Sequence, residues 1–239
     1  MKNKQGFTLA EVLITLGVIG IVAALTIPQL IKNYQKNILK QQFKKAYSTI
    51  SLALQKAEYD LGGNVNCYYN SAKFDPNSST TMSTQVSECS VFFDAIANNF
   101  NSVKKCVGNP EEAGCFPKGG YKGGEKLASL NCPEDQKEEA EDYYNRTCQG
   151  YNTYYIKHAT SYLLNDGLII FSYGSGNMPL FAFDINGHKG PNKWGYDVFS
   201  IALVKNTLKS GIILKPSSGC QPVEKGGVKI HEFMNDLYK

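Results

Sequence analysis

Residues 7–31 read FTLAEVLITLGVIGIVAALTIPQLI, and this stretch decides how the chain is organised. Glu11 is its only formally charged residue, and the two lysines Lys2 and Lys4 precede it. As a helix that rises about 1.5 Å per residue, the stretch is roughly 37 Å long, which exceeds the roughly 30 Å hydrocarbon core of a bilayer. The pattern therefore predicts one transmembrane helix close to the N-terminus.

The order of residues at the start of this stretch is more specific than its hydropathy. Gly6 and Phe7 are followed by Glu11, and Pro28 lies near the end of the apolar run. This arrangement, over about residues 4–31, resembles the leader and N-terminal helix of type IV prepilins and type II secretion pseudopilins. The resemblance implies that a membrane peptidase cleaves after Gly6 and methylates Phe7, and that Pro28 is the helix-kinking proline of the family.

Glu11 is the informative exception in an otherwise apolar helix. A carboxylate in hydrocarbon is costly unless it is paired, so an intramembrane acid is a candidate functional residue. In a packed bundle of such helices, Glu11 could pair with the free N-terminal amine of a neighbouring subunit and fix the axial stagger. The alternative is a neutral glutamic acid near the headgroups, whose side chain reaches water.

The helical pattern continues beyond the predicted span. From Ile31 to Ala57, apolar residues recur mostly at spacings of three and four, and Gly62 and Gly63 supply a stop. We therefore expect one helix over residues 7–61, with its first half in lipid and its second half packed on a domain.

The C-terminal third of the sequence has the pattern of β-strands. Residues 162–164 and 168–171 flank Asn-Asp-Gly, which predicts a hairpin, and further strands are expected at 180–183, 198–204 and 212–214. The predicted fold class is α+β: a long N-terminal helix, membrane-spanning in its first half, packed on a head with an antiparallel sheet of three to five strands and a disulfide-stapled loop region.

These patterns divide the chain into five parts. They are a leader peptide (1–6), a transmembrane helix (7–31), the amphipathic half of the helix (32–61), a Cys-rich loop region with a short helix at about 89–105 (62–152), and the antiparallel sheet with the C-terminal region (153–239).

Seven cysteines all lie beyond the predicted span, at positions 67, 89, 106, 115, 132, 148 and 220. They form no CxxC and the chain has only three histidines, so zinc-ligand spacing is absent and a disulfide framework in an oxidising compartment is favoured. Closure of short loops favours the pairs Cys106–Cys115 and Cys132–Cys148, and the odd count leaves one thiol over.

The orientation in the membrane follows from the cysteines and the leader. Both favour a single-pass protein of the cytoplasmic (inner) membrane whose C-terminal domain lies on the outer, periplasmic or extracellular side. Five lysines between residues 32 and 45 indicate the opposite orientation by the positive-inside rule, and we give them less weight.

Residues 184–197 read DINGHKGPNKWGYD, between two expected strands. The opening Asp-x-Asn-Gly resembles the start of calcium loops, and the segment is similar to a late hairpin loop that holds calcium in some pseudopilins. This resemblance predicts calcium bound by Asp184, Asn186 and Asp197. The segment lacks the bidentate glutamate of an EF-hand, and the alternative is a tight turn in which the two aspartates cap backbone amides.

The sequence gives little support to an enzyme. The three histidines have no partner pattern, and no serine occurs as G-x-S-x-G. From residue 60 onward there are 17 basic and 19 acidic residues, so nucleic acid is not an expected partner.

The family resemblance implies a structural subunit of a type IV pilus or a type II secretion pseudopilus. Its partners would be copies of itself or other pilins, the prepilin peptidase and methylase, the inner-membrane assembly platform, and lipid before assembly. The alternatives are a minor tip pilin that acts as an adhesin or DNA-uptake module, and a membrane-anchored enzyme, which would need a concave site with converging titratable groups.

Overall fold

The structure is a computed structural model of the chain, and it describes residues 8–63, 91–131, 151–172, 180–205, 211–216 and 221–235. The chain forms two compact units, Met1–Gln41 and Gln42–Lys239, and we call the second unit the head. The described elements are α1 (Leu9–Asp60), a helical segment at 91–98, β1 (Ser102–Cys106), α3 (Gly124–Asn131), α5 (Thr153–Lys157), β2 (Thr160–Leu164), β3 (Ile169–Ser172), β4 (Leu180–Asp184), the 3-10 helix η3 (Gly187–Lys189), β5 (Val198–Lys205), β6 (Ile212–Lys215) and α6 (Ile230–Asn235).

Helix α1 confirms the predicted long N-terminal helix. It contains Pro28 and has the length and hydropathy to cross a membrane, a property that α1 alone has among the described residues. At its C-terminal end Gly62 and Gly63 both adopt φ 77°, a left-handed conformation that glycine accepts without strain. Their amides donate to the carbonyls of Tyr59 and Glu58, which ends the helix where the sequence predicts.

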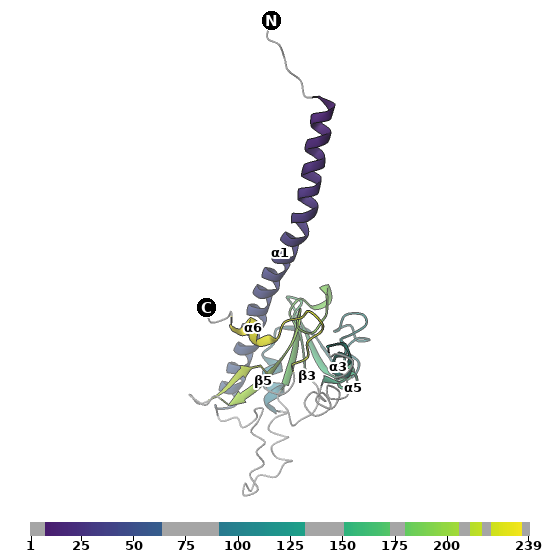
Figure 1. The fold of residues 1–239 in the computed structure, drawn as a ribbon. Coiled ribbons are helices and arrows are strands. Elements are labelled where there is room, and N and C mark those ends of the chain that lie inside the picture. Colours follow the sequence, from purple (N-terminus) through teal and green to yellow (C-terminus); the bar gives the residue numbers. More distant parts are fainter. Residues whose placement is uncertain are drawn as a thin grey trace. The chain divides into compact units, whose positions relative to one another are not determined.

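The strands of the head form an antiparallel sheet in the order β1-β2-β3-β4-β5-β6, so each strand pairs with the next one in the chain (Figure 1). The predicted hairpin is confirmed as β2 and β3, in which Tyr162 lies opposite Ile170. In the β4–β5 hairpin Asp184 lies opposite Val198, and this register brings the two ends of the 185–197 loop together.

The C-terminal half of α1 packs on this sheet. Its buried residues follow the 3.6-residue period and are Phe43, Ala46, Ile50, Ala53, Leu54 and Ala57. The Phe43 ring lies 5.9 Å from that of Phe183 in β4 and 5.2 Å from that of Phe199 in β5. Phe233 of α6 adds a third ring at 5.1 Å from Phe43. An aromatic-rich core therefore lies between the helix and the sheet, and a further buried cluster includes Phe116, Phe171 and Trp194.

Three local expectations were wrong. The helix expected to reach residue 105 ends at 98, and β1 follows it, because residues 102–106 pair with β2 in the sheet. Pairing with the rest of the sheet overrides the weak helical periodicity of this segment, and it gives the described sheet six strands rather than three to five. Residues 153–157 form the short helix α5, where a β-like pattern was expected.

One predicted disulfide lies in the described part of the chain and is present. Cys106, the last residue of β1, bonds to Cys115 and closes the loop between them. The predicted partners Cys132 and Cys148 lie outside the described residues.

Candidate functional site

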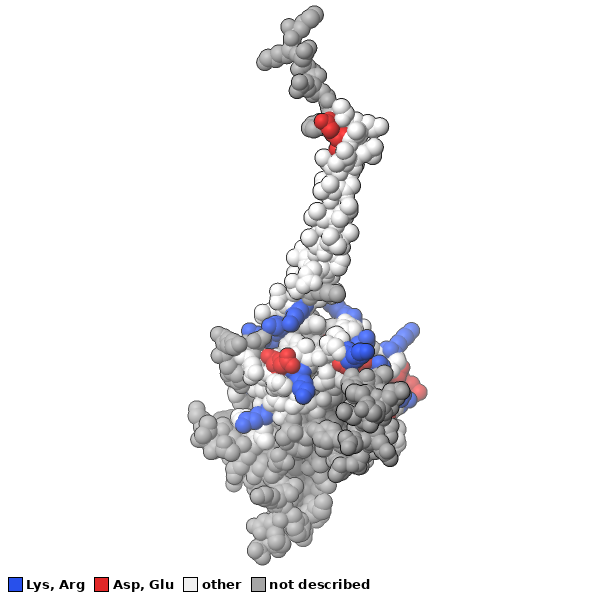
Figure 2. Space-filling view, in the orientation of Figure 1, with Lys and Arg blue, Asp and Glu red and all other residues white. Residues whose placement is uncertain are grey.

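The first candidate site is the start of α1. Gly6 and Phe7, the predicted cleavage and methylation residues, lie outside the described residues. Figure 2 shows a largely uncharged surface over the N-terminal part of α1, and in the sequence Glu11 is the only Asp, Glu, Lys or Arg among residues 8–31. The large apolar residues of this part are exposed within the chain, Leu9 by 79% and Leu25 by 74%. Such a surface needs lipid or neighbouring helices to cover it.

Glu11 has a partner that the sequence analysis missed. Its carboxylate accepts hydrogen bonds from the backbone N–H of Thr8 at 2.8 Å and from the Thr8 hydroxyl at 2.9 Å. The Glu11 amide donates to the Thr8 Oγ1 in return, at 3.3 Å. This reciprocal pair is a capping box, and the T-x-x-E spacing in the sequence is its signal. Within the single chain, Glu11 therefore stabilises the beginning of its own helix.

The second candidate site is the turn between β4 and β5. Antiparallel pairing places Asp184 at the end of one strand and Asp197 just before the next, and the amide of Ile185 donates to the Asp197 carbonyl at 2.9 Å. Both aspartates are fully buried. The structure thus brings two of the three predicted calcium ligands together, with Asn186 two residues from the first.

Hydrogen bonds occupy both oxygens of the Asp184 carboxylate. Its Oδ1 accepts from the amides of Asn186 at 3.1 Å and Gly187 at 2.8 Å. Its Oδ2 accepts from the Tyr121 hydroxyl at 3.0 Å, and the Asn192 amide group fits its surroundings when its nitrogen faces this oxygen at 3.1 Å. No lone pair of Asp184 is left for a metal in this arrangement.

Asp197 closes the other end of the turn. Its two carboxylate oxygens accept from the backbone amides of Asn192 at 2.8 Å and Lys193 at 2.7 Å. The side-chain oxygen of Asn186 is buried without a hydrogen-bond partner. The described residues contain no group of three or more His, Cys, Asp or Glu that could hold a metal ion. The hydrogen bonds to Asp184 and Asp197 are those of a tight turn in which the aspartates cap backbone amides. Calcium could bind Asp184 only if the turn rearranged. The calcium site stays a prediction.

Burial gives this turn an unusual protonation behaviour. Loss of solvation, followed by the nearby Asp197 carboxylate, raises the pKa of Asp184 from 3.8 to about 7. Burial also raises the pKa of Asp197. The pKa of Tyr121, which donates to Asp184, is raised well above its ordinary value by burial and then by the charge of Asp184.

A backbone conformation near this turn requires glycine. Gly187 has φ 60°, and a Cβ there would lie 2.1 Å from the carbonyl oxygen of Gly167 in the β2–β3 turn. The two hairpin turns thus approach each other through backbone atoms alone. Any side chain at residue 187 would push them apart.

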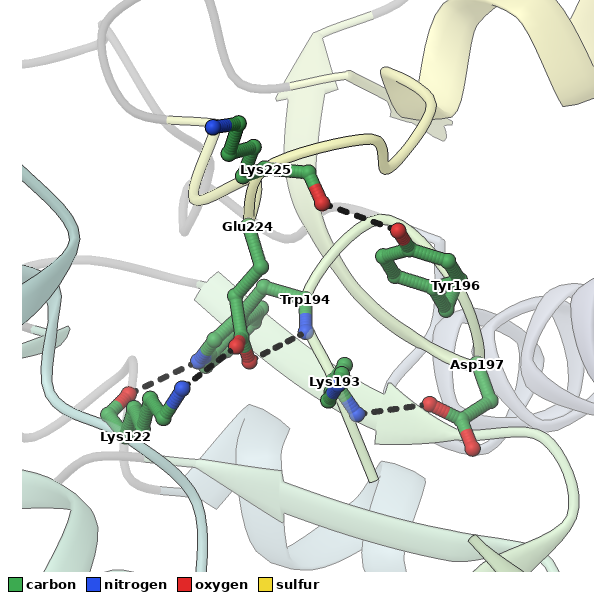
Figure 3. A network of polar contacts seen from close by, with 7 residues as sticks. All are labelled: Lys122, Lys193, Trp194, Tyr196, Asp197, Glu224 and Lys225. Atoms are coloured by element: carbon green, nitrogen blue, oxygen red, sulfur yellow. Dashed lines mark hydrogen bonds and ion pairs between the residues drawn. The ribbon is translucent and has the colours of Figure 1, made fainter. Parts of the chain in front are cut away.

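The 185–197 loop between β4 and β5 also makes hydrogen bonds to the segment 221–228, and Trp194 is central to these contacts (Figure 3). Trp194 is fully buried; its indole Nε1–H donates to the Lys122 carbonyl at 2.8 Å and its backbone N–H to the Glu224 carboxylate at 3.3 Å. Glu224 is itself buried and forms an ion pair with Lys122 at 2.8 Å. Tyr196 adds a hydrogen bond from its hydroxyl to the Lys225 carbonyl at 2.8 Å. This network joins three segments that lie far apart in the sequence, so the turn is a structural junction of the head.

Comparison with known proteins gives one match. The family model of the prokaryotic N-terminal methylation motif matches residues 1–27. The chain matches no curated protein and no solved structure. The matched motif supports the type IV pilin-like and pseudopilin family, and it indicates a structural protein that prepilin peptidase processes before filament assembly. Together with the apolar N-terminal part of α1, it fits anchoring in the inner membrane before assembly.

The raised pKa of Asp184 predicts that the head becomes less stable as the pH rises from about 4 to about 7, because the folded state would hold this proton more tightly than the unfolded state. Its stabilising contribution is fully present below about pH 4 and is lost as the pH rises to about 7, at about 1.4 kcal/mol per pH unit. We expect the melting temperature of a fragment from residue 32 onward to fall between pH 5 and pH 8. In Asp184→Asn the fall should be smaller, while the exposed control Asp60→Asn should behave as the wild type.

The same measurement tests the calcium prediction. A bound cation favours the charged carboxylates, so millimolar calcium at pH 8 should raise the melting temperature and shift Trp194 fluorescence if the turn binds it. Asp184→Asn should weaken both responses. If calcium changes neither signal in the wild-type fragment, the turn is a metal-free junction.

Proposed function

We propose that the chain is a structural subunit of a type IV pilus or a type II secretion pseudopilus. The observation that carries this proposal is the N-terminal methylation motif over residues 1–27, which includes most of the apolar part of α1. A membrane anchor alone would need only the apolar helix. The motif adds a processing site at the boundary between the charged leader and that helix.

Processing comes first in the proposed sequence of events. The chain is inserted in the cytoplasmic membrane with its head on the outer side, and the prepilin peptidase hydrolyses the Gly6–Phe7 peptide bond. The new amine of Phe7 is then methylated. Glycine before the bond leaves the backbone accessible to the protease, which a larger side chain would hinder.

Assembly then transfers the apolar helix from lipid to a bundle of neighbouring helices on the inner-membrane assembly platform. The exposed apolar surface of α1 supports this step, because it is too extensive to stay in water. In the bundle, the Glu11 carboxylate pairs with the N-terminal amine of another subunit. Glu11 is already oriented by Thr8 at the first turn of the helix, close in sequence to the amine that cleavage creates.

A minor tip pilin is the second candidate function. Two exposed tyrosines on the head favour it, since Tyr154 is 65% and Tyr155 38% exposed. Exposed aromatic side chains of this kind are common at binding surfaces. These tyrosines favour a tip pilin that binds a ligand over one that takes up DNA.

The processing step gives the test of the proposed function. When the chain is produced with a prepilin peptidase, the wild type should lose residues 1–6 and Gly6→Leu should stay uncut, because leucine obstructs access to the bond. Gly17→Leu, within the apolar helix and with no atom within 4 Å of a Cβ added there, is the matched control and should be cleaved. Cleavage of Gly6→Leu at the same rate as the wild type would contradict the assigned site.

A further inference from the structure

An exposed aromatic cluster lies on the short helix α5. The Tyr154 ring is 5.6 Å from that of Tyr155 and stacks on the His158 ring, with centroids 4.3 Å apart and planes inclined by 32°. The Tyr154 side chain is 65% exposed, so neither ring covers its outer face. An aromatic ring presented in this way offers an apolar face to a ligand.

Several contacts hold this cluster in place. The Asn152 side chain caps α5 by accepting from the Tyr155 amide at 2.9 Å, and the Glu125 carboxylate of α3 accepts from the Thr153 amide at 3.1 Å. A ring nitrogen of His158 lies 2.7 Å from the Tyr154 carbonyl oxygen. The aromatic cluster is therefore ordered before any ligand binds, and this order reduces the conformational entropy lost on binding.

A polar cleft of about 400 Å³ adjoins the same helix and is lined by Asn109, Glu111, Glu112, Lys118 and Lys157. The cleft is open to solvent, and four of its five lining residues are exposed. Lys157 stands three residues after Tyr154, and residues at that spacing are neighbours on a helix. Lys157 therefore links the cleft to Tyr154, which is not itself one of the lining residues.

Asn109, Glu111 and Glu112 of the cleft belong to one loop. The Cys106–Cys115 disulfide closes it, and the amides of Cys115 and Phe116 both donate to the Pro110 carbonyl, at 2.8 Å and 3.0 Å. Glu111 is oriented by the Gly119 amide, which donates to its carboxylate at 2.7 Å. The disulfide and these hydrogen bonds thus fix the loop that carries the carboxylates of Glu111 and Glu112.

The charges of the cleft restrict its ligand. Two lysines and two glutamates balance, and one amide adds a donor and an acceptor. Within the described part of the chain, the structure shows no ion pair that joins these four charged groups. A nucleic-acid backbone would meet two carboxylates, and a purely apolar ligand would leave the polar lining unpaired. A neutral ligand with many hydroxyls matches both the donors and the acceptors.

We propose that this cleft and the Tyr154 ring bind a neutral oligosaccharide. A sugar ring stacks its C–H face on Tyr154, and its hydroxyls donate to Glu112 and accept from Lys118 and Lys157. The site lies entirely in the head, so it stands independently of the filament role proposed above.

The test uses the full-length chain, purified in a polyoxyethylene detergent because maltoside headgroups would compete. It is applied to an array of neutral, sialylated and sulfated oligosaccharides and to a single-stranded oligonucleotide. We expect binding to neutral oligosaccharides, and Tyr154→Ala should weaken it by about tenfold or more. Tyr59→Ala, at a tyrosine that is 85% exposed on α1, is the matched control and should leave the affinity unchanged.

Tyr154→Phe keeps the ring and should keep most of the affinity for the oligosaccharide. This variant therefore tests the role of the ring even if Tyr154→Ala disturbs the fold. The spectrum of the buried Trp194 reports on that disturbance. The proposal is wrong if no neutral oligosaccharide binds, if binding is confined to anionic glycans or the oligonucleotide, or if Tyr154→Phe loses as much affinity as Tyr154→Ala.

Discussion

Glu11→Val is expected to insert in the membrane normally and to form no filaments. Valine makes the span more apolar, so insertion is not impaired. The substitution also removes the only charged group among residues 7–31, and with it the proposed partner for a neighbour's N-terminal amine. Membrane fractionation and electron microscopy of the same cells would separate the two steps.

Because Glu11 also caps its own helix through Thr8, the valine variant alone cannot assign the cause. Glu11→Gln is the matched control, since glutamine preserves the capping box and lacks the charge. We expect Glu11→Gln to fail in assembly as well. Normal filaments from Glu11→Gln, together with none from Glu11→Val, would show that capping rather than charge pairing is what assembly requires.

Phe43→Ala is expected to destabilise the head by about 3–5 kcal/mol, the usual cost of removing a buried phenylalanine. The Phe43 side chain is fully buried and contacts rings from β4, β5 and α6, so no single neighbour can fill the space. Against a total stability of about 5–15 kcal/mol this loss is large. Urea unfolding of the fragment from residue 32 onward, followed by Trp194 fluorescence, would measure it.

The control for Phe43→Ala lies on the same helix. Leu52 is 54% exposed, and Leu52→Ala should change the free energy of unfolding by no more than about 0.5 kcal/mol. Equal effects of the two substitutions would contradict the packing of the C-terminal half of α1 on the sheet. Such a result would mean that the regularly spaced apolar residues of 43–57 do not stabilise the head by packing on the sheet.

The elements that the sequence predicted well are those with local signals. The 3.6-residue period of α1 ends at two glycines, and the Asn-Asp-Gly turn determines the β2–β3 hairpin. The Cys106–Cys115 bridge closes a short loop, which proximity in the sequence favours. In each case the determining residues lie within a few positions of each other.

The elements that the sequence did not predict depend on distant partners. Strand β1 exists because β2, more than fifty residues later, pairs with it; its own residues include two lysines and little hydrophobic alternation. Helix α5 is short, and its start is stabilised by the Glu125 carboxylate from α3. Residues 102–106 carry no local strand pattern, and for α5 the local signal is limited to the N-cap residue Asn152.

The candidate sites show the same division. Asp184 and Asp197 could be placed together from the expected hairpin, whereas Tyr121, Lys122 and Glu224 reach the turn from segments with no recognisable motif. The Thr8–Glu11 capping box could have been found, because its spacing is visible in the sequence.

The N-terminus of the protein in assembled material tests the central claim most directly. Mass spectrometry of filaments sheared from cells, or of the membrane-bound chain produced with a prepilin peptidase, would identify the first residue and its modification. The proposed function predicts a chain that begins at Phe7 with a methylated amine and lacks residues 1–6. An intact Met1 terminus in assembled material would contradict the prepilin assignment.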